Sequence, residues 1–172
     1  REAYALFRDR EPVAKLGGSI FLYEVERRGD TATVAFSAIN PASLDPSLHE
    51  QFQTNDVQSR WFDARESMFW PANGGWMAVR ADEVPSSPEL AALQPDTPIA
   101  EADGQRLYAL PSPPKLAWAT SAVPFGDGLT FLGQQTAVSN TNEVALLTAW
   151  RVERDGGKRP LKIFIHAVNA ND

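Results

Sequence analysis

Short apolar segments separated by Pro, Gly, Asp and Ser run through the first 110 residues and predict strands that alternate with short helices. One predicted helix covers residues 46–52, with Asp45 as its N-cap and Pro46 at its first position. The other begins at Pro88, with Ser87 as its N-cap. Strands are expected at residues 31–37, 57–62, 76–79, 99–100 and 107–110.

Residues 13–29 carry two conflicting patterns. Gly17 and Gly18 weaken a helix, and residues 19–23 have the propensity of a strand. Residues 27–29, Arg-Arg-Gly, are nevertheless typical of a helix C-terminus. Apolar side chains also recur at helical spacing, at Val13, Leu16, Ile20 and Tyr23. On balance the pattern favours a helix.

The pattern changes after residues 111–114, Pro-Ser-Pro-Pro, which are typical of an extended linker. Beyond them the chain predicts strands at residues 129–133, 144–152 and 161–168. Residues 155–158, Asp-Gly-Gly-Lys, provide hairpin-turn chemistry between the last two strands. The sequence therefore predicts two domains, residues 1–112 and residues 115–172.

The expected fold class is α+β. A small α/β layer, a Rossmann-like half, is followed by an antiparallel β-sandwich portion. The second domain has about half of the strands that a closed sandwich needs, so we expect the sandwich to be incomplete, with an open strand edge.

Composition excludes several classes of function. The 172-residue chain has a net charge of -6 and no basic stripe, which argues against nucleic acid as a partner and against membrane binding by charge alone. There is no cysteine, and no apolar run reaches the ~18–20 residues of a membrane span. The chain starts at Arg1 without a methionine, which suggests a piece of a longer protein.

Motifs for catalysis, cofactors and metals are also missing. The sequence lacks Gly-x-Ser-x-Gly, and its glycines match no dinucleotide or phosphate loop. His49 and His166 are far apart, and His166 lies in an apolar segment where a structural role is expected. No His, Asp and Glu cluster has the spacing of metal ligands. We therefore predict no cofactor, no metal site and no assigned catalytic residue.

The most distinctive stretch, residues 60–71, combines aromatic and charged side chains. One interpretation makes Asp63 and Glu66 a carboxylate pair that binds sugar hydroxyls, while indole rings stack on the apolar faces of sugars. The simpler interpretation, which we favour, places the aromatic residues in the core and pairs Asp63 with Arg65 at a turn. The candidate ligand-binding residues are Trp61, Asp63, Arg65, Glu66, Trp70 and Trp76.

Several of these segments together resemble the extramembrane C-terminal region of bacterial polytopic glycosyltransferases of the dolichyl-phosphate-mannose–protein mannosyltransferase type. In that family a strand after a Gly-Asp turn precedes an arginine-aromatic-Asp-x-Arg-x-Ser stretch, a short strand, a Pro-rich helix start and a Tyr-x-Leu strand. The matching residues here are 29–30, 60–67, 71, 76–79, 85–93 and 103–110, followed by 125–133, 148–152 and 163–172 in the β segment.

The resemblance is diffuse, covers about three quarters of the chain and concerns accessory regions. It implies an extracytoplasmic location, periplasmic or at the cell surface, and a membrane association only through a transmembrane part that this chain does not contain. The catalytic acid and lipid-phosphate site of the family lie in or beside that membrane part. No catalytic residue therefore carries over, although the parent protein would be a glycosyltransferase.

Three functional hypotheses follow. The first is a non-catalytic accessory domain that contacts an acceptor glycan or acceptor protein. The second is a structural or protein-interaction module with no small-molecule ligand, in which residues 144–152 or 161–168 supply an open β edge for strand addition or a homodimer. The third is an enzyme, and it requires Asp63 and Glu66 to converge in a cleft with a shifted pKa.

Overall fold

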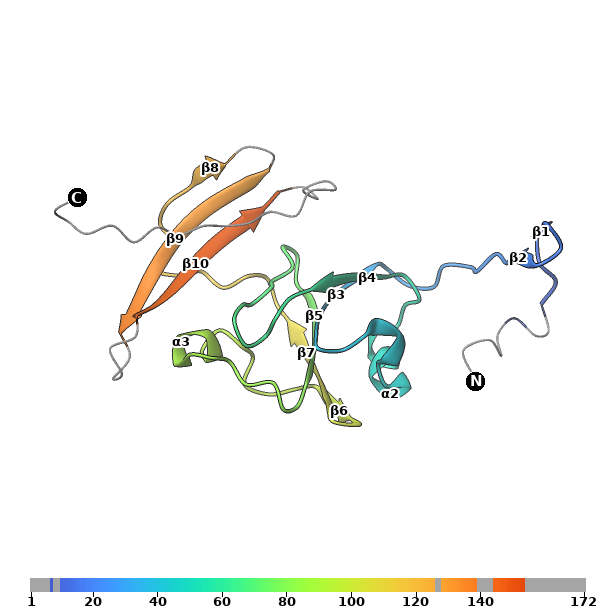
Figure 1. Ribbon diagram of the computed structural model, residues 1–172, viewed down its shortest axis with the longest axis horizontal. Helices are drawn as coiled ribbons and strands as arrows, with labels where there is room; N and C mark the ends of the chain where they lie inside the picture. The colour runs from blue at the N-terminus through green and yellow to red at the C-terminus, as the bar shows by residue number, and fades with distance from the viewer. Residues whose placement is uncertain (1–6, 8–9, 126–127, 139–143, 154–172) are drawn as a thin grey trace. The chain divides into compact units, whose positions relative to one another are not determined.

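A computed structural model describes residue 7 and residues 10–125, 128–138 and 144–153 of the protein (Figure 1). The chain divides into two compact units, Arg1–Pro113 and a second unit that begins at Pro114. This division falls within the linker expected at residues 111–114. The described chain is rich in strands and contains few helical residues.

Within the described part of the first unit, five strands form a mixed sheet in the order β4-β3-β5-β7-β6. β3 lies between β4 and β5 and pairs in parallel with both. β7 pairs antiparallel with β5 on one side and with β6 on the other. The strands are β3 (Ala32–Ser37), β4 (Val57–Trp61), β5 (Gly75–Arg80), β6 (Ala100–Ala102) and β7 (Gln105–Leu110).

The two connections between parallel strands cover opposite faces of this sheet. The chain leaves β3 through η1 (Pro41–Ser43), α2 (Pro46–His49) and η2 (Glu50–Phe52) before it enters β4. It then passes through residues 62–74 to reach β5 on the other side of β3. Parallel crossovers are right-handed, so two crossovers that run in opposite directions along a sheet pack on opposite faces.

Two core clusters reflect this arrangement. The first contains Phe36 of β3 with Leu48 of α2 and Phe52 of η2. The second contains Met77 of β5 with Tyr108 of β7, and Phe62, Met68 and Trp70 of the β4–β5 connection pack against it. Both faces of the sheet are therefore buried, as expected for strands that carry nearly continuous apolar runs.

Local sequence signals placed the short helices correctly. Asp45 caps α2, where its Oδ1 accepts a hydrogen bond from the Ser47 N–H at 2.9 Å. Ser87 caps α3 (Pro88–Ala91), where its Oγ accepts one from the Leu90 N–H at 3.2 Å. Each helix has a proline at its first position, where a missing N–H costs nothing.

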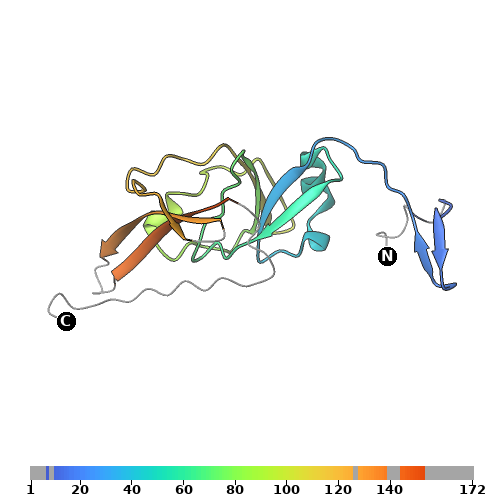
Figure 2. The same ribbon diagram turned by 90° about the horizontal axis from the view of Figure 1, so that it is seen from above.

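The helix expected over residues 13–29 is wrong. β1 (Ala14–Leu16) and β2 (Ile20–Leu22) form an antiparallel hairpin there, seen as a two-stranded ribbon in Figures 1 and 2. The turn places Gly17 at φ 58° and Gly18 at φ 79°. The register pairs Leu16 with Ile20 and leaves a three-residue loop, and glycine adopts its two consecutive positive φ angles without a steric penalty. The helical spacing of the apolar residues was coincidental.

The described part of the second unit contains three antiparallel strands in the order β10-β9-β8. They are β8 (Val123–Phe125), β9 (Leu129–Val138) and β10 (Val144–Val152). β8 was not expected, and β9 extends five residues beyond the predicted strand at 129–133. The strand predicted at residues 161–168 and the turn at 155–158 lie outside the described residues. The structure thus shows an antiparallel sheet in this unit.

One face of this sheet is apolar. Phe131 lies opposite Val123 on one side and Trp150 on the other, and Leu129 likewise lies between Phe125 and Val152. Val123, Phe125 and Val152 are about half exposed. The reverse face carries Thr130 and Arg151, which both contact Glu153. We call the first side the C-terminal apolar face; its members are Val123, Phe125, Leu129, Phe131, Trp150 and Val152.

Candidate functional site

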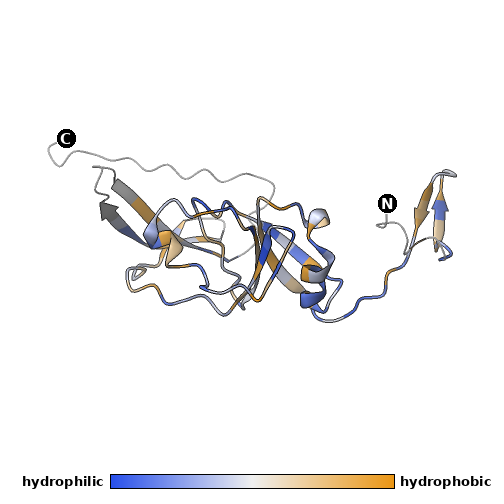
Figure 3. Ribbon diagram, turned by 90° about the horizontal axis from the view of Figure 1, so that it is seen from below, coloured by the Kyte–Doolittle hydropathy of each residue, from blue (hydrophilic) through white to orange (hydrophobic). Residues whose placement is uncertain are grey.

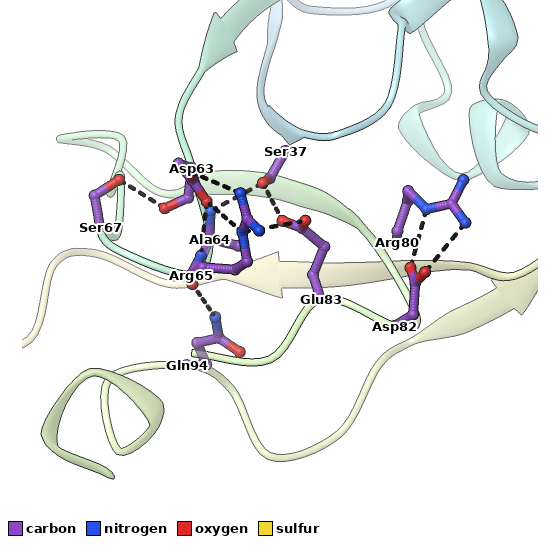
Figure 4. Close-up of polar contacts among 9 residues, drawn as sticks. All are labelled: Ser37, Asp63, Ala64, Arg65, Ser67, Arg80, Asp82, Glu83 and Gln94. Carbon is purple, nitrogen blue, oxygen red and sulfur yellow. Dashed lines mark hydrogen bonds and ion pairs between the residues drawn. The ribbon is translucent and has the colours of Figure 1, made fainter. Parts of the chain in front are cut away.

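A group of polar side chains lies where the parallel strands β3, β4 and β5 end (Figure 4). β3 leads to β4 on one side and β5 follows on the other, so the strand order changes direction between β3 and β5. In open sheets with parallel strands, ligands bind at the carboxyl ends of the strands at such a point. The carboxyl ends of β3, β4 and β5 are therefore the candidate functional site of the first unit.

Ser37, the last residue of β3, is the centre of this group. Its hydroxyl donates to Glu83 Oε2 at 2.7 Å and accepts from the Ala64 N–H at 2.9 Å. Ser37 is 1% exposed, and Ala38 follows it with φ 53°, in the left-handed region that alanine rarely adopts. The hydroxyl thus links the end of β3 to the segments that follow β4 and β5.

Arg65 extends the network towards the surface. Its Nε lies 3.4 Å from Asp63 Oδ1 and 3.9 Å from Glu83 Oε1. Asp63 also closes a turn, because its Oδ1 accepts from the Arg65 N–H at 3.0 Å and its backbone oxygen accepts from Ser67. The predicted pairing of Asp63 with Arg65 at a turn is confirmed.

The electrostatics of this network favour the ionised forms. The Arg65 backbone N–H, followed by its guanidinium, holds the pKa of Asp63 below its usual value of 3.8. The hydrogen bond to Asp63 raises the pKa of Arg65 in turn. The neighbouring pair Arg80 and Asp82, with Nε 2.9 Å from Oδ1, shows the same two shifts. A carboxylate held ionised accepts hydrogen bonds well and donates protons poorly at neutral pH.

Glu66 lies on the same turn as Asp63, and its backbone N–H donates to the Asp63 carbonyl at 3.1 Å. Its side chain is exposed, and its charge adds a small favourable interaction with Arg65. The enzyme hypothesis needs one of these two carboxyl groups to hold a proton near neutral pH. The lowered pKa of Asp63 argues against that residue as the proton donor.

The three candidate tryptophans do not lie together. Trp61 ends β4 on the side of the first core cluster, 6.0 Å between ring centroids from Phe36, and it is 62% exposed. Trp76 packs against Phe52 in the same cluster, at 5.5 Å. Trp70 packs on the opposite face, and its Nε1 donates to the Pro111 carbonyl at 2.8 Å. Sequence reasoning expected the aromatic residues of the stretch 60–71 in the core, which is wrong for Trp61.

The structure thus brings together Asp63, Arg65 and Glu66 but separates Trp70 from Trp61 and Trp76. It adds Ser37 and Glu83, which sequence reasoning missed because they are 46 residues apart and belong to no motif. The only local signals were Ser37 at the end of a β-branched strand and the acidic pair at residues 82–83, just after β5. The ligand-binding role of the six candidate residues stays a prediction.

No protein-family model, curated protein or solved structure matches this chain. The likeness to glycosyltransferase accessory regions therefore rests on the sequence segments alone. Within the described ranges, no three His, Asp or Glu side chains are grouped so that they could hold a metal ion. The helices of those ranges are too short or too polar to cross a bilayer.

Proposed function

We propose that this chain is a non-catalytic accessory domain, the extracytoplasmic part of a membrane glycosyltransferase, and that it contacts the acceptor glycan or acceptor protein. The supporting observation is the position of Trp61, an exposed indole two residues before the ionised Asp63 at the carboxyl edge of the parallel strands. An indole face suits the apolar face of a sugar ring. Two and four residues further along the chain, the carboxylate of Asp63 and the guanidinium of Arg65 supply hydrogen-bonding groups of fixed charge.

The charge state of the edge supports binding over catalysis. Asp63 and Arg65 are 46% and 62% exposed at their side chains, so a ligand can reach both. Each neutralises the other, which leaves polar groups that can accept or donate to hydroxyls without an unpaired charge. Contacts of this kind recognise a ligand without changing it.

The test is calorimetric titration of the full chain with mono- and oligosaccharides at millimolar concentration. We expect weak binding that Trp61→Ala and Asp63→Asn each reduce at least fivefold. Asp82→Asn is the matched control, because Asp82 forms a similar exposed pair with Arg80. The absence of binding by the wild-type chain, or equal losses in the control, would remove the glycan as ligand.

A different observation favours protein interaction as a second candidate function. The C-terminal apolar face is partly exposed, and the outer edges of β8 and β10 carry no further strand within the described residues. We propose that this sheet is one layer of a β-sandwich and that its edge strand β10, Val144–Val152, accepts a partner strand or a second copy. Light scattering that finds a strict monomer at all accessible concentrations would count against the homodimer.

A further inference from the structure

The β1–β2 hairpin is apolar on one face and exposes a large apolar side chain, Phe21, beside Lys15 on the other. Its register places Leu16 opposite Ile20 and Ala14 opposite Leu22, so these four side chains share one face. Phe21 lies on the other face, where the Lys15 ammonium is 5.5 Å from the centre of its ring. The exposed large apolar residues of the hairpin and its flanks are Val13, Leu16, Ile20, Phe21, Leu22 and Val25, each 44–64% exposed. Figure 3 shows hydrophobic colouring along the hairpin, interrupted in one strand by a hydrophilic segment.

A hairpin of this kind is poorly suited to water. Two strands of three residues each bury little of their own surface, and isolated two-stranded hairpins are at best marginally stable. A contiguous apolar patch on a folded chain marks a surface that contacts another molecule or a membrane. The hairpin therefore needs an apolar surrounding.

We propose that the β1–β2 hairpin inserts into the interfacial layer of a lipid bilayer. A second copy or a flat protein surface would cover one face and leave the other in water. A lipid layer surrounds the hairpin and covers both faces. This inference rests on the hairpin alone and holds whether or not the chain contacts a glycan.

Charge supports a lipid partner. Lys15 is the only charged residue between Pro12 and Tyr23, whereas the whole chain has a net charge of -6. A lysine near the tip can extend its ammonium to anionic headgroups while its carbon chain stays among acyl groups. One lysine adds little affinity, so apolar contact supplies most of the binding.

The dimensions of the hairpin match the interface and not the bilayer core. Strands of three residues extend about 10 Å, close to the ~5–10 Å to which interfacial segments enter a membrane. The outer edges of the hairpin have backbone groups that headgroups and water can satisfy, and that the hydrocarbon core cannot. At the base, Tyr23 packs on Phe7 with ring centroids 4.8 Å apart, and such aromatic residues are common at the membrane–water boundary.

The test is co-sedimentation of the full chain with vesicles of phosphatidylcholine alone, or of phosphatidylcholine in which about a third of the lipid is anionic phosphatidylglycerol. We expect association with both, stronger with the anionic vesicles. Leu16→Ser/Ile20→Ser should lower the partition coefficient about tenfold or more. Lys15→Glu should lower binding to anionic vesicles several-fold and binding to neutral vesicles little.

The matched control is Val84→Ser/Ile99→Ser, which removes two apolar side chains of similar exposure outside the hairpin. It should bind vesicles like the wild type. Thermal unfolding of the hairpin variant should match that of the wild type, so that lost binding is not lost folding. Absence of vesicle binding by the wild type, or equal loss in the control, overturns the proposal. So does a lipid-free dimer that only the hairpin variant abolishes, because that result assigns the hairpin to a second copy.

Discussion

The five-stranded sheet and the three-stranded sheet of this protein solve the burial of apolar side chains differently. In the first, crossover segments cover both faces, and Val34, Met77 and Leu107 are fully buried. In the second, Phe125 and Val152 on one face remain more than half exposed. Strand pairing is extensive in both sheets, so pairing alone does not produce a core. A sheet needs a second layer, and only the first sheet shows one within the described residues.

The largest expected effect on stability comes from removing a buried side chain of the five-stranded sheet. Phe36→Ala removes a side chain that is 1% exposed, and we expect it to lower the free energy of unfolding of the first unit by about 3–5 kcal/mol. Phe125→Ala is the control at the exposed sheet, and it should cost less than about 1 kcal/mol. Urea unfolding followed by tryptophan fluorescence measures both. Similar losses in the two variants would contradict the contrast.

A smaller effect is expected at Ser37, which links the segments that follow β4 and β5. Ser37→Ala leaves the Ala64 N–H and the partly buried Glu83 carboxylate without this partner, which should cost about 1–3 kcal/mol. Ser67→Ala is the matched control, because its hydroxyl donates to the Asp63 carbonyl at an exposed turn. That variant should stay within about 0.5 kcal/mol of the wild type. If the two variants lost the same free energy of unfolding in urea, the buried hydrogen bonds of Ser37 would not contribute to stability.

Polar substitution of the C-terminal apolar face should barely change stability. Phe125→Ser/Val152→Ser alters side chains that are about half exposed, so we expect a change of about 0.5–1 kcal/mol in urea unfolding. The same variant should bind much less of a dye that fluoresces on apolar surfaces. Unchanged dye fluorescence would show that this face is covered in solution.

The smallest expected effect is the pH dependence of stability that comes from Asp63, at the carboxyl ends of the parallel strands. The pKa of Asp63 is lowered in the folded chain, so its contribution to stability is complete above the unfolded value near 3.8 and is lost as pH falls through the folded value. Asp63→Asn should therefore differ from the wild type in thermal unfolding at pH 7, and the difference should disappear as the pH falls through the folded pKa of Asp63. Arg65→Gln should keep part of this pH dependence, because the backbone N–H remains the main donor to Asp63. A difference that persists at low pH would assign the effect to something other than charge.

Local signals explain what the sequence predicted correctly. Asp45 and Ser87 act on N–H groups within three residues, so their N-cap roles follow from adjacent sequence. The Asp63–Arg65 pair is equally local. The prediction of a helix over residues 13–29 failed because the same apolar positions fit both a helical and a strand period. The positive φ angles of Gly17 and Gly18 form the turn of a hairpin instead. β8 was missed because Pro124 interrupts a three-residue strand.

Long-range contacts were beyond reach from one sequence. The hydrogen bond between Ser37 and Glu83 depends on β3 and β5 lying side by side, which sequence pattern does not specify. The exposure of Trp61 likewise depends on β4 being an edge strand. Because tryptophan is mostly buried on average, a tryptophan in a strand is expected in the core until the strand order is known.

The strand order β4-β3-β5-β7-β6 also bears on how the first unit folds. β6 and β7 form a hairpin with a two-residue turn at Asp103-Gly104, which can close within microseconds. The parallel pair β3–β5 joins segments about 40 residues apart in sequence and must close a much longer loop. We therefore expect the C-terminal half of this sheet to nucleate folding and β3 with β4 to join late. A chain emerging from the ribosome would hold β3 unpaired with β5 until the later strands were made.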